Sequence, residues 1–142
     1  FGCDRFRDLR PLHRLPNLVK LSMPCSIQEG DLLGISISQT SIRQLDLRNC
    51  RNIVDIEPLS RMTDLLDLSL AGCRSITDIS PLAALKKLVR LDLACCTEIT
   101  DLSPLRGLRR LRDLYVGGCT NLDRKEILMF RKTHPKCEVH TV

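Results

Sequence analysis

A cysteine that returns at a fixed interval is the feature that most constrains the fold of this chain. Four cysteines keep the interval, Cys50, Cys73, Cys96 and Cys119, since 73−50, 96−73 and 119−96 each equal 23. Three prolines keep it as well: Pro58, Pro81 and Pro104. A fixed period of this size is the sequence sign of a repeat architecture, in which each repeat buries its apolar face only against its neighbours. We therefore expect one continuous array of similar structural units.

Just before each cysteine, two aliphatic residues flank one outward-facing residue, as in a half-buried strand. The pairs are Leu45/Leu47, Leu68/Leu70, Leu91/Leu93 and Leu114/Val116. The resulting frame, L-x-x-L-x-L-x-x-C-x-x-I, resembles the leucine-rich-repeat signature. The resemblance implies an α/β solenoid of period 23, with parallel strands on the concave face and short helical or 3-10 connectors on the convex face.

Two halves of the repeat resemble different subclasses of that family. The "C-x-x-I-T-D" half is similar to the cysteine-containing repeats of F-box substrate adaptors. The "I-T-D-I-S-P-L-x-x-L-x-x-L" half is similar to internalin-like repeats. Both subclasses imply a binding surface, and neither implies a particular partner, because function lies in the site and not in the fold.

The register divides the chain into repeats over residues 1–122 and a cap over residues 123–142. The first repeat is truncated, since "GCDRFRDLRPL" matches "GCRSITDISPL" seventy residues later, so we expect the segment to come from a longer array. Residues 24–44 are irregular, and their repeat is one residue longer. In the cap, Asp123 is the expected N-cap of a helix that ends before Pro135. Cys137 and Val139 fall one full period after Leu114 and Val116, which predicts a last strand in that register.

The cysteines are expected to be structural, in a column of thiols at the turn after each strand: Cys3, Cys50, Cys73, Cys96 and Cys119. A zinc site is the alternative, but its ligands must converge on one point, whereas these cysteines are one strand spacing apart in a line. Disulfides along such a column are disfavoured, which indicates a reducing intracellular compartment: cytoplasm, nucleus or organelle matrix. Cys25 and Cys95 fall outside the column and are expected to be exposed.

An aspartate column accompanies the cysteines, at Asp8, Asp55, Asp78 and Asp101. Aligned carboxylates can bind a cation, but a repeated aspartate in a turn more often accepts hydrogen bonds from its own backbone amides, and we favour that interpretation. Ser80 and Ser103 precede prolines and are expected to be helix N-caps.

Partner binding must use the positions that the repeat leaves free, which are the outward residues around each strand. Tyr115 is the only tyrosine of the chain and is expected between Asp92 and Glu138, with Arg90 and Asp113 nearby. Tyrosine and arginine often dominate interface energetics. The predicted concave surface for a protein partner comprises Tyr115, Arg90, Asp92, Asp113, Asp67, Asp46, Arg48 and Glu138. The alternative is a tyrosine that lies flat on the sheet and touches nothing.

The net charge of +5 comes largely from the connectors, where five residues form a basic ridge: Lys86, Lys87, Arg106, Arg109 and Arg110. Such a ridge can contact RNA phosphates within a ribonucleoprotein or multiprotein assembly, although it lacks aromatic residues that stack on bases. Its simpler role is to cover aliphatic surface and keep the protein in solution.

Catalysis is not expected. The three histidines are dispersed, at His13, His134 and His140, and no cysteine has an orienting base in its register. The sequence predicts no metal site, cofactor or small-molecule substrate. It also lacks an apolar run long enough to cross a bilayer, so membrane insertion is not expected. The prediction is a non-catalytic scaffold or adaptor.

Overall fold

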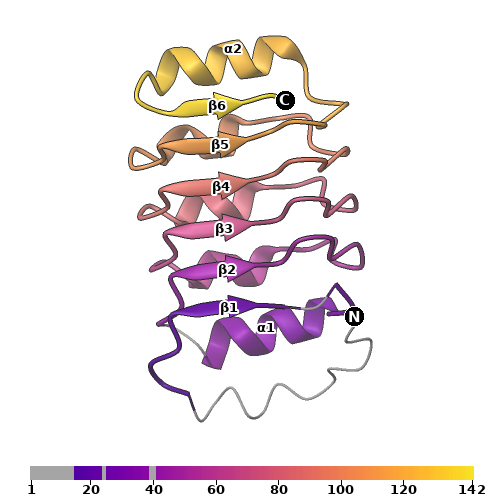
Figure 1. Ribbon diagram of the computed structural model, residues 1–142, viewed down its shortest axis with the longest axis vertical. Coiled ribbons are helices and arrows are strands. Elements are labelled where there is room, and N and C mark those ends of the chain that lie inside the picture. Colours follow the sequence, from indigo (N-terminus) through magenta and orange to yellow (C-terminus); the bar gives the residue numbers. More distant parts are fainter. Residues whose placement is uncertain (1–14, 24, 39–40) are drawn as a thin grey trace.

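A computed structural model of the chain describes residues 15–23, 25–38 and 41–142. Six short parallel strands form one sheet and are stacked in chain order from one end of the molecule to the other (Figure 1). They are β1 (Lys20–Ser22), β2 (Gln44–Asp46), β3 (Asp67–Ser69), β4 (Arg90–Asp92), β5 (Asp113–Tyr115) and β6 (Glu138–His140). The predicted parallel solenoid is thereby confirmed.

The strand register follows the leucine frame. Leu45, Leu68, Leu91 and Leu114 pair in succession, each one cysteine period after the last, and all four are buried. Leu21 pairs with Leu45, a step longer by the single extra residue that was expected in that repeat. The leucines and isoleucines of successive repeats form one continuous aliphatic core, so each repeat depends on its neighbours for burial.

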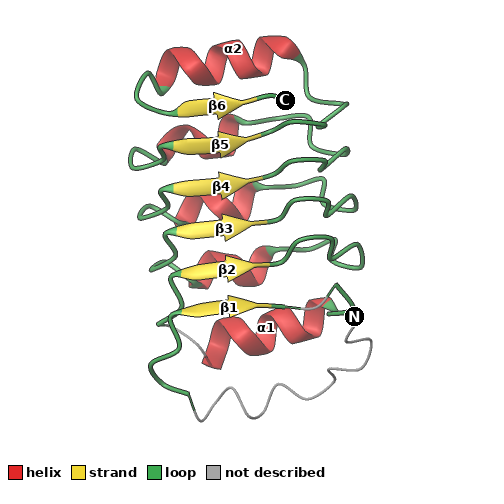
Figure 2. Cartoon of the chain, in the orientation of Figure 1, coloured by secondary structure: helices red, strands yellow, loops and turns green. Residues whose placement is uncertain are grey.

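Short 3-10 helices connect the middle strands on the convex side (Figure 2). They are η2 (Glu57–Arg61), η3 (Ser80–Ala84) and η4 (Ser103–Gly107), each with a proline in its first turn and one fully buried leucine. The irregular segment of residues 24–44 instead holds an α-helix, α1 (Glu29–Ser38), which packs on η2. Among the described residues, no helix is long and apolar enough to cross a membrane.

The predicted serine N-caps are wrong. Ile79 and Leu102 occupy the N-cap positions, and neither makes a side-chain cap bond. Asp78 and Asp101, one residue upstream of the N-cap positions, perform the capping role. Each carboxylate accepts a hydrogen bond from the backbone amide two residues later, at 2.8 Å from Ser80 and 2.7 Å from Ser103. Asp55 does the same with Glu57. The turn interpretation of the aspartate column is thus confirmed at these three positions; Asp8 lies outside the described residues.

The predicted register of the last strand is also wrong, by two residues. Val139, and not Cys137, pairs with Leu114, and His140 pairs with Tyr115, so the final step is longer than the cysteine period. The cause is α2 (Arg124–Thr133), which takes more chain than a five-residue 3-10 connector. Its N-cap is Asp123, as predicted. The side chain of Asp123 accepts a hydrogen bond from the backbone amide of Lys125. Phe130 of α2 is buried against the core and closes the end of the array.

Candidate binding surface on the concave face

Two rows of side chains line the strand face, because the first and third residues of each three-residue strand point away from the core. The N-terminal row consists of Lys20, Gln44, Asp67, Arg90, Asp113 and Glu138. The C-terminal row consists of Ser22, Asp46, Ser69, Asp92, Tyr115 and His140. Seven of the eight predicted concave residues belong to these rows, and Arg48 lies two residues after β2.

Tyr115 is the centre of a stacked cluster that spans β4, β5 and β6. Its ring stacks on the imidazole of His140, with centroids 4.2 Å apart and planes inclined by 12°. The guanidinium carbon of Arg90 lies 4.9 Å from the centroid of the tyrosine ring, a cation–π distance. We call Arg90, Tyr115 and His140 the stacked cluster. These two contacts exclude the alternative interpretation, in which Tyr115 lies on the sheet and touches no other side chain.

His140 is the residue of this cluster that the sequence prediction did not place in the binding surface. Asp92 flanks Tyr115 on one side as predicted, but His140, and not Glu138, flanks it on the other. The sequence prediction failed here because it did not take into account the length of α2, which determines where β6 begins. Once the residues of α2 are allowed for, the alternation of Glu138 and His140 aligns these two side chains with Asp113 and Tyr115.

His140 also lies close to two carboxylates. Its Nε2 atom is 3.7 Å from Oδ1 of Asp113, and its Nδ1 atom is 4.0 Å from Oε1 of Glu138. Both distances exceed those of direct hydrogen bonds. The imidazole is therefore held by its stacking on Tyr115 and by the strand register rather than by a bonded partner.

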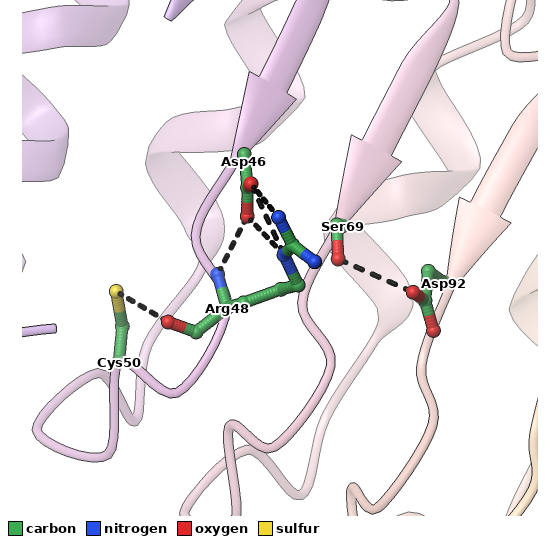
Figure 3. A network of polar contacts seen from close by, with 5 residues as sticks. All are labelled: Asp46, Arg48, Cys50, Ser69 and Asp92. Atoms are coloured by element: carbon green, nitrogen blue, oxygen red, sulfur yellow. Dashed lines mark hydrogen bonds and ion pairs between the residues drawn. The ribbon is translucent and has the colours of Figure 1, made fainter. Parts of the chain in front are cut away.

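Further along the face, Arg48 and Asp46 neutralise each other (Figure 3). The Nε atom of Arg48 donates to both carboxylate oxygens, and its Nη2 atom donates to Oδ2 at 2.7 Å. The side-chain hydrogen bond from Arg48 is the main reason why the pKa of Asp46 is lowered. In the same row, the carboxylate of Asp92 accepts hydrogen bonds from the backbone amide of Ala94 and from the hydroxyl of Ser69. These polar groups are satisfied internally and add little free attraction for a partner.

A hollow of about 230 Å³ lies between the pair of Arg48 and Asp46 and the stacked cluster. Its lining comes from β1 to β4 and includes Lys20, Gln44, Asp46, Arg48, Asp67, Ser69, Arg90 and Asp92. Because Arg90 also borders this hollow, a partner side chain can enter it and contact the stacked cluster at the same time.

The basic ridge occupies the connectors and not the strand face. Arg106 belongs to η4, while Lys86, Lys87, Arg109 and Arg110 lie in the turns that lead into β4 and β5, and all five side chains are exposed. The charge is partly neutralised, because Lys87 forms an ion pair with Asp64. The ammonium of Lys86 folds close over Gly107. The arginines of the ridge carry most of its available positive charge.

The seven described cysteines form no disulfide with one another, and Cys25 and Cys95 are exposed as expected. Cys73, Cys96 and Cys119 each donate to a backbone carbonyl of the preceding repeat at 3.0 to 3.1 Å. Burial raises the pKa of Cys73 to about 11 and that of Cys96 to about 12. The described column thiols are thus protonated at neutral pH and poorly reactive. Cys3 lies outside the described residues.

Comparison with known proteins agrees with this geometry. A family model described as leucine-rich repeats, two copies, matches residues 40–84. A search of curated proteins finds no match.

Several solved structures are similar. A leucine-rich-repeat protein of Leptospira interrogans has a TM-score of 0.68 at 22% identity, over 90% of this chain and 38% of its own. Internalin InlF of Listeria monocytogenes has a TM-score of 0.66 at 22% identity, over 95% of this chain and 51% of its own. Internalin C2 of the same organism has a TM-score of 0.62 at 29% identity, over 81% of this chain and 54% of its own.

The chain thus spans between about two fifths and about half of the length of these structures. The internalin-like resemblance of its connectors agrees with two of them, whereas the resemblance of its cysteine frame to F-box adaptors stays a prediction. The chain contains leucine-rich repeats and folds as a leucine-rich-repeat solenoid.

Proposed function

We propose that this chain is a non-catalytic binding module that captures a protein partner on its concave face, centred on the stacked cluster. The observation that carries the proposal is the alignment of Arg90, Tyr115 and His140 across three neighbouring strands. Leucine-rich repeats present such strand faces as extended concave surfaces.

The cluster has the properties of an interface anchor. Tyrosine and arginine are enriched among residues that dominate binding energy. Stacking between Arg90 and Tyr115 and between Tyr115 and His140 restrains these side chains before a partner arrives, so less conformational entropy is lost on binding. The adjoining hollow offers room for one partner side chain. The carboxylates of Asp67 and Asp113 beside Arg90 in the N-terminal row favour a partner that also carries a basic group.

Affinity purification of the full-length protein with quantitative mass spectrometry tests this proposal. We expect Tyr115→Ala and Arg90→Glu to abolish enrichment of the partner. Arg74→Glu should retain it, because Arg74 is an exposed arginine in the turn after Cys73, away from the strand face. Retention of the partner by both concave variants, with normal folding, overturns the proposal.

A second candidate function is contact with RNA phosphates through the basic ridge, as part of a larger assembly. It is favoured by the exposure of Arg106, Arg109 and Arg110 in one connector of the array. The double variant Arg109→Glu/Arg110→Glu should weaken RNA association and flatten its salt dependence, by roughly 0.7 in log–log slope for each lost single-strand phosphate contact. RNase treatment during the purification separates the two candidates, since a partner bound to the concave face survives it.

We also propose that the protein works in a reducing intracellular compartment. The lack of disulfides among the described cysteines and the exposure of the Cys25 and Cys95 thiols support this location. Fluorescence microscopy of the tagged full-length protein, together with alkylation of its thiols inside intact cells, tests it. Secretion of the protein or oxidation of both exposed thiols in the cell contradicts it.

A further inference from the structure

Three side chains that can ligate a metal ion meet at the C-terminal end of the concave face. They are Asp113 of β5 and Glu138 and His140 of β6, and one ligand atom from each lies within 4.8 Å of the other two. Asp113 and Glu138 are direct partners in the strand register, and His140 follows Glu138 on the same face. Hydrogen-bonded strands therefore hold all three residues in place.

The distances in this triad suit a shared ion better than direct hydrogen bonds. The gap of 3.7 Å between Nε2 of His140 and Oδ1 of Asp113 is too long for a hydrogen bond. Two ligands that each lie about 2.1 Å from one tetrahedral ion are about 3.4 Å apart. A small rotation of the Asp113 carboxylate is enough to bring the two ligand atoms to this separation. Oε1 of Glu138 lies 4.0 Å from Nδ1 of the same imidazole, and the side chain of Glu138 is largely exposed, which leaves space for its carboxylate to approach a shared ion.

An independent observation concerns the imidazole itself. The Nε2 atom of His140 is buried and has no hydrogen-bond partner within the described part of the chain. A buried polar atom without a partner is costly and calls for an explanation. The stacking of the ring on Tyr115 holds the plane of the imidazole, and in the structure Nε2 is the ring nitrogen nearer to Asp113. A metal ion between His140 and Asp113 satisfies this nitrogen.

We propose that Asp113, Glu138 and His140 bind a divalent transition-metal ion of the zinc type. One imidazole with two carboxylates matches the ligand preference of zinc, whereas calcium and magnesium prefer oxygen ligands alone. Three protein ligands leave one coordination position for water or for a group of a binding partner. The site shares His140 with the stacked cluster, but its test does not depend on the proposed protein-binding function, because the ion binds to the isolated chain.

Titration with Zn²⁺ by isothermal calorimetry and with Co²⁺ by visible absorption tests the site. The parent protein should carry Cys25→Ser and Cys95→Ser, because these exposed thiols are competing ligands. We expect one ion per chain and a cobalt spectrum without thiolate charge-transfer bands. Glu138→Gln and His140→Ala should each lower the affinity by about tenfold or more. Asp67→Asn is the matched control: it removes a carboxylate of the same row two strands away and should leave the affinity unchanged.

Folding is controlled by thermal unfolding of every variant. The side chain of Glu138 is 75% exposed, so Glu138→Gln should not alter the fold. Added Zn²⁺ should raise the melting temperature of the parent, and at the same zinc concentration it should raise that of Glu138→Gln by less. Three results overturn the proposal: no zinc binding by the parent at micromolar concentrations, equal affinity of the folded Glu138→Gln variant, or a cobalt spectrum with thiolate bands.

Discussion

The Sγ atom of Cys73 lies 3.1 Å from the carbonyl oxygen of Leu47, which belongs to the preceding repeat. The same bond joins Cys96 to Leu70 and Cys119 to Leu93. Each of these thiols is thus a donor between neighbouring turns of the solenoid as well as a small apolar side chain in the core. Each repeat of a solenoid is stabilised by its contacts with the neighbouring repeats. These hydrogen bonds therefore strengthen the interfaces between repeats, on which the stability of the array depends.

Replacement of Cys73 by alanine should lower the free energy of unfolding by about 1 to 2 kcal/mol, because the variant loses a buried sulfur atom, which leaves a cavity, and a weak hydrogen bond. Urea unfolding followed by circular dichroism measures the change. Cys25→Ala is the control, because Cys25 is exposed and its removal should change stability by less than about 0.5 kcal/mol. Equal effects of the two substitutions contradict a role of the column in packing.

The buried thiols should make the protein less stable at alkaline pH. Burial raises the pKa of Cys73 and Cys137 to about 11 and that of Cys50 and Cys96 to about 12, above the ordinary value of 9.0. Below pH 9 these thiols are protonated in both the folded and the unfolded chain, and their contribution to stability is fully present. Above pH 9 the unfolded chain ionises first, so the free energy of unfolding falls as the pH rises toward 11 to 12.

Urea unfolding at pH 8, 9 and 10 checks this dependence. Cys96→Ala should show a shallower decline than the parent, because it has one buried thiol fewer. A decline with the same slope in this variant assigns the effect to other titrating groups. Residue-resolved alkylation should also label Cys25 and Cys95 much faster than Cys73 and Cys96 in the native protein.

Gly72 should resist replacement by alanine. Its φ angle is +75°, and an added Cβ atom collides with Oδ1 of Asn49 in the preceding repeat. The left-handed backbone alone costs a residue other than glycine about 1 to 2 kcal/mol, and the contact forces Asn49 to move. We expect Gly72→Ala to destabilise the fold by at least that amount, as measured by urea unfolding.

Gly34→Ala is the matched control for this substitution. Gly34 lies within α1, and an added Cβ atom there meets nothing within 4 Å. Alanine is a better helix former than glycine by about 1 kcal/mol, so this variant should be as stable as the parent or more stable. Opposite signs for the two substitutions are expected; a loss of stability at Gly34 as large as that at Gly72 contradicts the explanation.

The repeat spacing was sufficient to predict the middle of the solenoid. Between Leu45 and Leu114 a fixed step, equal to the cysteine period, places every strand, since parallel neighbours must keep one register to bury their leucines. The same alternation placed Arg90 and Tyr115 on one face. This part of the fold is determined by periodicity alone.

Two features depended on local geometry that the period does not contain. The register of β6 depends on how much chain α2 uses before the next strand begins, and this shifted His140 beside Tyr115. The capping of η3 depended on a choice between two neighbouring oxygen-bearing residues, Asp78 and Ser80. The side chains of both residues carry oxygen atoms that can accept a hydrogen bond from a backbone amide. In the structure the 3-10 turn places the Asp78 carboxylate, and not the Ser80 hydroxyl, to accept the hydrogen bond, which the amide of Ser80 donates. Contacts between repeats of unequal length are therefore the part that required the structure.

The turn cap at Asp101 should contribute measurably to stability. Its carboxylate accepts hydrogen bonds from the backbone amide of Ser103 at 2.7 Å and from the hydroxyl of Ser103 at 2.6 Å. These hydrogen bonds, that of the hydroxyl foremost, lower the pKa of Asp101 below its ordinary value of 3.8. Asp101→Ala should cost about 1 kcal/mol, as loss of a helix cap does. The contribution is present above pH 3.8 and is lost as the pH falls through the lowered pKa of the folded state. Urea unfolding at pH 7 and pH 3 measures both effects. Asp64→Ala is the control, since the ion pair of Asp64 with Lys87 is exposed and should matter less; a larger loss at Asp64 contradicts the prediction.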